Sequence, residues 1–156
     1  MKLLTSVCGV IAGLALVGLA TGQDKDAVKE EMKKLEGKWT LAWFEQSGEK
    51  KKEVKPIGSE AFGFNASTII KDGKSTMTFE GKSVQYSFTV DPTKKPKTLD
   101  RVVAEGKFKG KALRYLYELD GDTLRLCYDA EKFDSRPKEF KAEGTITILT
   151  FERKKP

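Results

Sequence analysis

Short runs of strand-forming residues, separated by turn residues, recur along this chain from Lys38 onward. Residues 83–90 show the pattern most clearly, because four apolar residues alternate there with polar ones and so share one face of a strand. The other runs cover residues 38–46, 61–65, 68–71, 75–79, 98–104, 113–119, 123–129 and 145–153. Their spacing of roughly 8–12 residues is typical of antiparallel all-β domains.

The segments between these runs carry turn signals. Asp72-Gly73, Glu80-Gly81-Lys82 and Asp120-Gly121 each separate two runs, and Asp-Gly between alternating runs strongly favours a hairpin. We expect loops over the polar residues 49–60, with room for one helical turn, and over residues 131–143. About eight antiparallel strands predict a small meander barrel, with a sandwich as the alternative.

One helix is expected before the strands, over residues 24–35. Val28, Met32 and Leu35 follow each other at helical spacing and form a narrow apolar stripe. Gly37 then ends the helix.

The first residues have the three parts of a signal peptide. Lys2 is followed by a long uncharged stretch, and the small residues Ala20 and Gly22 precede the polar Gln23. We therefore expect cleavage after Gly22, a single domain over residues 23–156, and export to the periplasm or out of the cell. The alternative is an uncleaved anchor, because an uncharged stretch of ~18–20 residues can just span a bilayer. After cleavage we expect no stable membrane span.

Residue types that the sequence lacks exclude several chemistries. There is no histidine, and of the two cysteines only Cys127 lies outside the expected signal peptide. These counts exclude Ser-His-Asp and Cys-His catalytic sites, His-ligated metals and an internal disulfide. We expect no enzyme, no cofactor and no metal. Asp120-Gly121-Asp122 is interpreted as a hairpin turn rather than a calcium loop, because the residues after it alternate as a strand.

Cys127 lies on the strand expected over residues 123–129, on the face opposite Leu124 and Leu126. We expect a passive, partly covered thiol. The alternative is a reactive thiol whose pKa is lowered by Arg125, which lies two residues away.

Lysines gather in four groups, although the formal net charge of the chain is only +6. The groups lie at residues 50–55, 94–97, 107–111 and 153–155, and acidic residues flank them. They are interpreted as solvated loops, and we expect no nucleic-acid partner. The alternative is an anionic partner in the cell envelope.

Gly37-Lys38-Trp39 follows the expected helix directly, and Arg153 ends the last expected strand. A guanidinium stacks well on an aromatic face. The combination resembles lipocalins, in which Gly-x-Trp begins the first strand and an Arg from the last strand covers the Trp ring. The resemblance implies a structural role for Gly37, Trp39 and Arg153.

A closer resemblance is to a family of uncharacterised exported lipocalin-like proteins that are typical of planctomycete bacteria. The similar stretches are residues 35–39, 91–100, 117–124, 126–128, 136–140 and 150–153. They cover nearly the whole expected domain in the right order. The resemblance implies a calycin-like barrel and export, and it implies no reaction.

Aromatic residues on the inward faces of the strands are the candidates for a ligand site. We expect the lining to comprise Trp43, Tyr86, Phe88, Tyr115, Tyr117 and Tyr128. The hypothesis is a monomeric, non-enzymatic protein that holds a small apolar or amphipathic ligand, and the tyrosines favour a ligand with polar atoms. The alternative is an envelope interaction protein with a filled barrel that acts through its Lys-rich loops.

Overall fold

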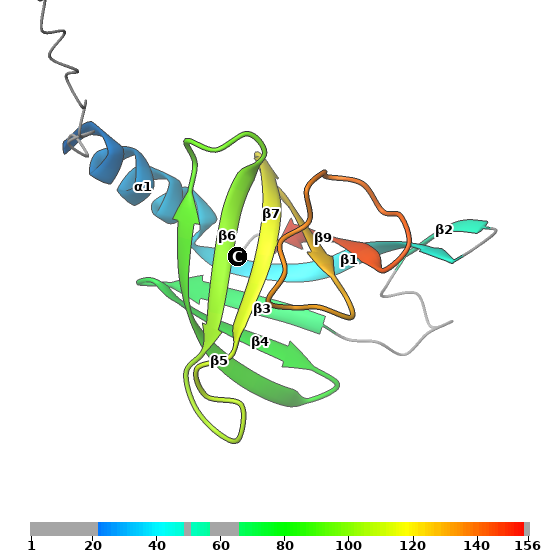
Figure 1. Cartoon of the computed structure of the whole chain (residues 1–156). Coiled ribbons are helices and arrows are strands. Elements are labelled where there is room, and N and C mark those ends of the chain that lie inside the picture. The colour runs from blue at the N-terminus through cyan, green and yellow to red at the C-terminus, as the bar shows by residue number, and fades with distance from the viewer. Residues whose placement is uncertain (1–21, 49–50, 57–65, 155–156) are drawn as a thin grey trace, which may run out of the picture.

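The computed structural model describes residues 22–48, 51–56 and 66–154 of the 156-residue chain. In these parts of the chain one helix precedes nine strands (Figure 1). The elements are α1 (Gly22–Leu35), β1 (Gly37–Gly48), β2 (Lys51–Pro56), β3 (Ala66–Lys71), β4 (Lys74–Phe79), β5 (Lys82–Asp91), β6 (Lys97–Val103), β7 (Ala112–Asp120), β8 (Thr123–Asp129) and β9 (Ile146–Arg153). The expected signal peptide, except Gly22, and the strand expected over residues 61–65 lie outside the described residues.

The strands close into an antiparallel barrel. From β3 to β9 each strand pairs with the next one in the chain, and β1 pairs with both β3 and β9. Eight strands, β1 and β3 to β9, therefore form a closed meander barrel, with one short helix before it. The predicted all-β barrel is confirmed, and the sandwich alternative is wrong.

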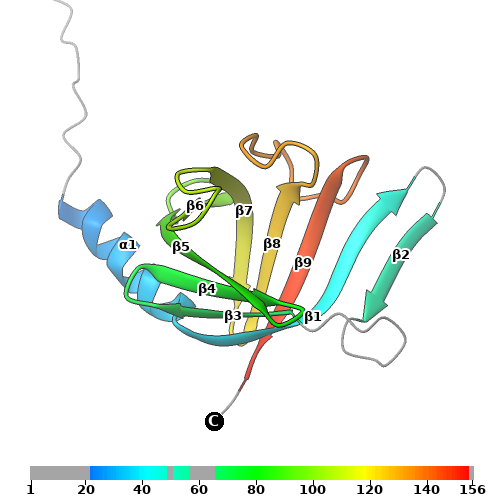
Figure 2. The ribbon, with the colours of Figure 1, turned by 90° about the horizontal axis from the view of Figure 1, so that it is seen from below.

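The structure corrects the expectation of a loop over residues 49–60, because residues 51–56 form β2. Residues 37–40 of β1 pair with β3, whereas residues 43–48 pair with β2 on the same edge. Figure 2 shows β2 beside β1, and residues 43–46 of β1 pair with β9 on their other edge. β1 is longer than the strand expected over residues 38–46. β2 pairs with the backbone N–H and C=O groups along one edge at the far end of β1, which would otherwise be unpaired there.

Two hairpins have the backbone conformation that their turn residues favour. Asp72 and Gly73 have φ angles of 50° and 70°, and Glu80 and Gly81 have φ angles of 47° and 78°. Two consecutive residues with positive φ match the right-handed twist of the flanking strands. The turn residues therefore join β3 to β4 and β4 to β5 without a longer loop.

β1 contains a bulge that changes which side chains face inward. Leu41 pairs with Phe151 and Trp43 pairs with Thr150, so the register shifts between Leu41 and Trp43. A bulge inserts one residue and reverses the alternation beyond it. Phe44 therefore packs against the core, and Trp43 is 39% exposed.

The barrel buries one apolar cluster inside and a smaller one on its outer surface. The inner cluster contains Leu35, Trp39, Leu41, Ala66, Ile70, Phe88, Val90, Leu99, Tyr115, Tyr117, Leu124, Leu126 and Phe151. The outer cluster contains Leu116, Cys127 and Ile148, which face away from the interior because they alternate with inner residues. Phe140, Ala142 and Ile146 from the segment before β9 cover this outer cluster.

The β8–β9 loop, residues 130–145, is held against the barrel by Arg136. Its guanidinium forms an ion pair with Asp100 and donates a hydrogen bond to the carbonyl of Tyr115. It also donates to the carbonyl of Leu99 over 3.5 Å. These three partners lie on β6 and β7, so one side chain joins the loop to two strands.

The two ends of the barrel differ. α1 lies at the end where β1 begins and β9 finishes (Figure 1), and Leu35 and Trp39 are fully buried there. We call this the closed end. The opposite end carries the β4–β5 turn, the β6–β7 loop and the β8–β9 loop, and we call it the open end.

Candidate functional site

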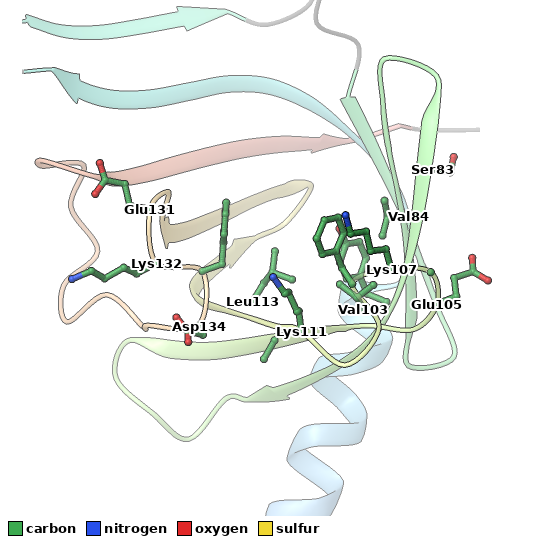
Figure 3. Close-up of a pocket in the computed structure, with 15 residues that line it drawn as sticks. Ser83, Val84, Val103, Glu105, Lys107, Lys111, Leu113, Glu131, Lys132 and Asp134 are labelled. Atoms are coloured by element: carbon green, nitrogen blue, oxygen red, sulfur yellow. The ribbon is translucent and has the colours of Figure 1, made fainter.

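A cavity of about 1050 Å³ lies at the open end of the barrel. Its walls come from the start of β5, the end of β6, the β6–β7 loop, the start of β7 and the β8–β9 loop (Figure 3). The lining residues are Ser83, Val84, Tyr86, Val103, Glu105, Gly106, Lys107, Phe108, Lys111, Ala112, Leu113, Glu131, Lys132, Phe133 and Asp134. Drug-sized molecules bind in pockets of ~300–1,000 Å³, so this space is large enough for one.

The lining of this open-end cavity is apolar on its walls and charged around its entrance. Val103 and Leu113 come from neighbouring strands and form part of the apolar wall. Three lysines and three carboxylates also line the cavity: Lys107, Lys111, Lys132, Glu105, Glu131 and Asp134. Opposite charges are equal in number here, so the entrance favours neither sign strongly. The combination suits a molecule with both apolar and polar parts.

Phe108 is 54% exposed, and it lies in the β6–β7 loop at the entrance. The ammonium groups of Lys107 and Lys111 lie 5.9 and 5.0 Å from the centre of its ring. Cations at this distance are attracted to the ring face. The two lysines therefore partly cover an exposed aromatic ring at the entrance.

An aromatic series connects the barrel interior to the cavity. The ring centres of Tyr115 and Tyr128 are 5.6 Å apart, and those of Tyr128 and Phe133 are 5.9 Å apart. The rings of Tyr128 and Phe133 are nearly parallel, with an interplanar angle of 12°. The carbonyl of Phe133 accepts a hydrogen bond of 2.8 Å from the Arg114 amide, which fixes this part of the β8–β9 loop.

Burial keeps the hydroxyl groups near the cavity protonated. Burial raises the pKa of Tyr115 to about 12, although the positive charge of Arg101 opposes this effect. Burial also raises the pKa values of Tyr86 and Tyr128. At neutral pH all three are therefore phenols that can donate hydrogen bonds, and none carries a negative charge.

Arg101 lies next to the cavity, inside the barrel, and is only 1% exposed. It occupies the inner face of β6 between Leu99 and Val103. Its Nη1 contacts Met77 Sδ at 3.7 Å, and its Cζ lies 5.8 Å from the ring centre of Tyr86. Within the described part of the chain, its Nε and Nη2 are buried without a hydrogen-bond partner.

Four of the residues expected to line the barrel lie in or beside this region. Tyr86 lines the cavity directly. Tyr115 and Tyr128 belong to the aromatic series, and Phe88 is buried opposite Arg101 on the neighbouring strand.

The other two expected lining residues lie elsewhere. Tyr117 lies at the closed end, where its hydroxyl donates to Glu31 of α1. Trp43 faces outward after the bulge in β1, and Phe44 takes the inward position. The expectation that Trp43 lines the interior is therefore wrong, because simple alternation along β1 does not anticipate an inserted residue.

Several residues in or beside the cavity were not among the expected ones. Alternation over residues 97–103 places Leu99, Arg101 and Val103 on one face, and this signal was available for Arg101. No periodic signal marks Phe108 or Phe133, because both lie in irregular loops.

Trp39 and Arg153 meet at the closed end. Arg153 Cζ lies 4.1 Å from the Trp39 ring centre, and Trp39 Nε1 donates a hydrogen bond of 2.8 Å to the carbonyl of Leu35. The Arg153 guanidinium also donates to the carbonyls of Glu36 and Lys34. Arg153 thus joins the last strand to the end of α1, and its contacts are those of a structural residue.

Gly37 allows this close approach. Its φ angle is 131°, and a side-chain Cβ at this position would lie 2.8 Å from Arg153 Nη1. The backbone conformation therefore requires glycine, and a side chain here would displace the Arg153 guanidinium.

α1 is fixed over the closed end by the buried Glu31. Its carboxylate accepts hydrogen bonds from Lys97 Nζ at 2.7 Å and from the Tyr117 hydroxyl at 3.1 Å. Burial and the neighbouring Glu31 charge raise the pKa of Tyr117. The sequence offered no reason to select Glu31, because it lies among many exposed charges of one helix.

Cys127 is fully buried in the outer cluster. Its thiol points to the carbonyl of Glu139, with 3.7 Å between Sγ and the oxygen. Burial raises the pKa of Cys127 to about 11, and the smaller effect of Arg125 does not reverse this. Arg125 is instead placed over the Phe140 ring, 4.9 Å from its centre. These contacts favour the passive thiol.

Among the described residues, no group of three or more histidine, cysteine, aspartate and glutamate side chains is placed to hold a metal. Asp122, in the expected hairpin turn, accepts a hydrogen bond from Arg153 Nε over 3.1 Å. No helix in the described part of the chain is both long enough and apolar enough to cross a membrane.

Comparisons with known proteins give no relative. No family model matches the chain, and neither a curated protein nor a solved structure matches it.

Proposed function

We propose that this protein binds a small amphipathic molecule in the open-end cavity. The observation that carries the proposal is a space of about 1050 Å³ with apolar walls and a charged entrance. A side-chain-filled barrel, with no pocket of at least ~300 Å³, would have contradicted it. The protonated tyrosines beside the cavity supply donors for the polar atoms of such a ligand.

The proposal includes export and a lipocalin-like relationship. The signal-like pattern of residues 1–22 supports export to the periplasm or beyond the cell. The barrel with a leading helix, together with Gly37, Trp39 and Arg153, supports a lipocalin-like ancestry. The role is that of a binding protein without a chemical step, because the contacts of the cavity suggest no acid–base pair.

The cavity can be tested with the neutral fluorescent dye Nile red. Leu113→Trp places a large ring in the wall of the cavity and should weaken dye binding about tenfold or more. Ile69→Trp is the matched control, because Ile69 is 49% exposed on β3 and does not line the cavity. Dye fluorescence in a titration measures both affinities.

The proposal fails if Nile red does not bind the wild-type protein, or if both tryptophan variants bind it as the wild type does. Native mass spectrometry of protein purified from its natural host gives a second measurement. An additional mass that survives desalting and disappears in Leu113→Trp identifies a ligand of the cavity.

A further inference from the structure

Arg101 is a buried charge without a counterion among the residues that the structure describes. Its side chain is 1% exposed, and among the described residues no carboxylate forms an ion pair with it. The carboxylates that line the cavity, Glu105, Glu131 and Asp134, are exposed at the entrance. Arg101 differs in this respect from Arg125, Arg136 and Arg153, which each have an acidic partner.

Such a residue is unfavourable unless something else pairs with it. An arginine keeps its charge in a protein interior, unlike a lysine, which can lose its proton when buried. Buried charges in folded proteins are nearly always paired, because the loss of hydration is otherwise uncompensated. A position that faces the inside of a barrel could easily hold a leucine or a valine. The presence of arginine there points to a partner that the described part of the chain does not supply.

The geometry of the guanidinium specifies the shape of that partner. Nη1 faces Met77 Sδ at 3.7 Å, whereas Nε and Nη2 have no partner among the described residues. Nε and Nη2 form one edge of the planar group, and their two N–H bonds match the two oxygens of a carboxylate. The ring centres of Tyr86 and Tyr115 lie 5.8 and 5.5 Å from Cζ.

Further polar atoms without partners lie on the adjoining inner face. Thr68 Oγ1 and Ser75 Oγ are buried without a hydrogen-bond partner in the described part of the chain. Thr68 belongs to β3 and Ser75 to β4. Thr68 pairs with Met77 of β4, and Met77 is the residue that contacts Arg101. Buried hydroxyls are normally satisfied, so three unsatisfied side chains in one region of the interior favour an absent polar group.

Arg101 lies directly behind the cavity wall. Its neighbour two residues along β6 is Val103, and its register partner on β7 is Leu113. Both line the cavity, as does Tyr86, whose ring flanks the guanidinium. Tyr86 is only half-buried: it lines the cavity, and its ring centre lies 5.8 Å from Arg101 Cζ.

We propose that Arg101 binds the carboxylate of an amphipathic monoanion, with the acid group inside the barrel and the apolar tail toward the open end. This inference rests on the proposed binding function and specifies its ligand class. A single guanidinium balances one negative charge, so a monocarboxylate suits the site better than a doubly charged phosphate ester. The apolar wall at Val103 and Leu113 then contacts the tail.

The test compares decanoate with 1-decanol, which have the same chain length and differ in charge. Displacement of Nile red at pH 8 measures both affinities. The wild type should bind decanoate about 30-fold or more tightly than decanol, because a buried charged pair contributes this much to binding. Arg101→Met should reduce the preference to within about fivefold while decanol binding is retained. Arg101→Lys keeps the positive charge but lacks the two parallel N–H donors of the guanidinium. Its preference for decanoate should lie between those of the wild type and Arg101→Met.

Lys111→Met is the matched control, because Lys111 is an exposed cation at the entrance of the same cavity. It should keep the wild-type preference to within about fivefold, since exposed charges contribute little. Thermal unfolding gives a second measurement: decanoate should raise the Tm of the wild type more than that of Arg101→Met. Without ligand, Arg101→Met should unfold at the same temperature as the wild type or higher, because it removes an unpaired buried charge.

Equal affinity of the wild type for decanoate and decanol would overturn this inference, and so would a preference that persists in Arg101→Met. If Arg101→Met does not fold, the wild type and Arg101→Lys still decide the question. Binding of decanol and Nile red without a preference for decanoate leaves the proposed binding function intact. Absence of binding by all three compounds overturns both.

Discussion

The two tryptophans of β1 have opposite environments although they are four residues apart. Trp39 is fully buried beneath Arg153, and Trp43 is 39% exposed on the outer face. Trp39→Ala should lower the free energy of unfolding by ~3–5 kcal/mol, because it leaves a large hole in the core. Trp43→Ala should lower it by less than ~1 kcal/mol. Urea denaturation of both variants measures the difference.

The comparison also tests the structural interpretation of Gly-x-Trp. A loss below ~1 kcal/mol for Trp39→Ala would show that the ring does not lock the closed end. Equal losses for the two variants would show that the bulge after Leu41 is misplaced, because the bulge alone separates their environments.

For single residues, the sequence predicts which side chains face inward where apolar and polar residues alternate regularly along a strand. The prediction fails where a bulge interrupts this alternation. Tyr86 lies between two polar residues and Tyr115 alternates with Leu113 and Tyr117, and both tyrosines face inward as expected. Trp43 does not, because the inserted residue in β1 leaves no mark in the sequence pattern. Arg101 also lies at an inward alternating position, but a charged residue in such a position is easily dismissed as solvent-exposed.

Arg136 is one of the residues that hold the β8–β9 loop in position. Arg136 pairs with Asp100 and donates to backbone carbonyls of β6 and β7, and the same loop covers Cys127. Loss of hydrogen bonds to a charged group costs about 1.5–3 kcal/mol. Arg136→Ala should therefore increase the rate at which a maleimide labels Cys127 by roughly 10- to 100-fold. A mass-spectrometric time course of labelling measures this rate.

Lys138→Ala is the control, because Lys138 is an exposed residue of the same loop. It should label at the wild-type rate. The midpoint of urea unfolding separates opening of the loop from loss of the whole fold. Fast labelling of Arg136→Ala with an unchanged midpoint supports local opening, whereas slow labelling would show that other contacts hold the cover.

Regular elements were predictable and irregular ones were not. The expected strand over residues 123–129 has the bounds of β8, because the Asp120-Gly121 turn precedes it and its residues alternate regularly. β2 was missed, since its sequence KKEVKP has no apolar face and its pairing with β1 is what makes it a strand. The residues that line the open-end cavity come largely from loops, which have no period to detect.

The barrel as a whole has a closed end and an open end that contains a cavity. α1, Glu31 and the Trp39–Arg153 pair close one end, and the open-end cavity lies at the other. All four tyrosines of the chain face the interior between these ends, and burial raises the pKa of each of them. The whole fold should therefore respond to alkaline pH.

An unfolded tyrosine has a pKa of about 10, and burial in the fold raises the pKa of Tyr115 to about 12. The folded state therefore favours the neutral phenol. This contribution is fully present below pH ~10 and is lost as the pH rises toward 12, because the unfolded chain then releases protons that the folded chain holds. Tyr115 alone should account for about 2–3 kcal/mol of stability lost across this window.

Urea denaturation at pH 8, 10 and 11, with phenolate absorbance near 295 nm as a second signal, measures this loss. We expect little phenolate in the folded protein at pH 10 and a cooperative increase only when the protein unfolds. Tyr115→Phe is the control: it keeps the ring and removes one titrating group, so its stability should fall less steeply above pH 10. Early, gradual ionisation of Tyr115 and Tyr117 in the folded protein would contradict the buried positions that the barrel assigns to them.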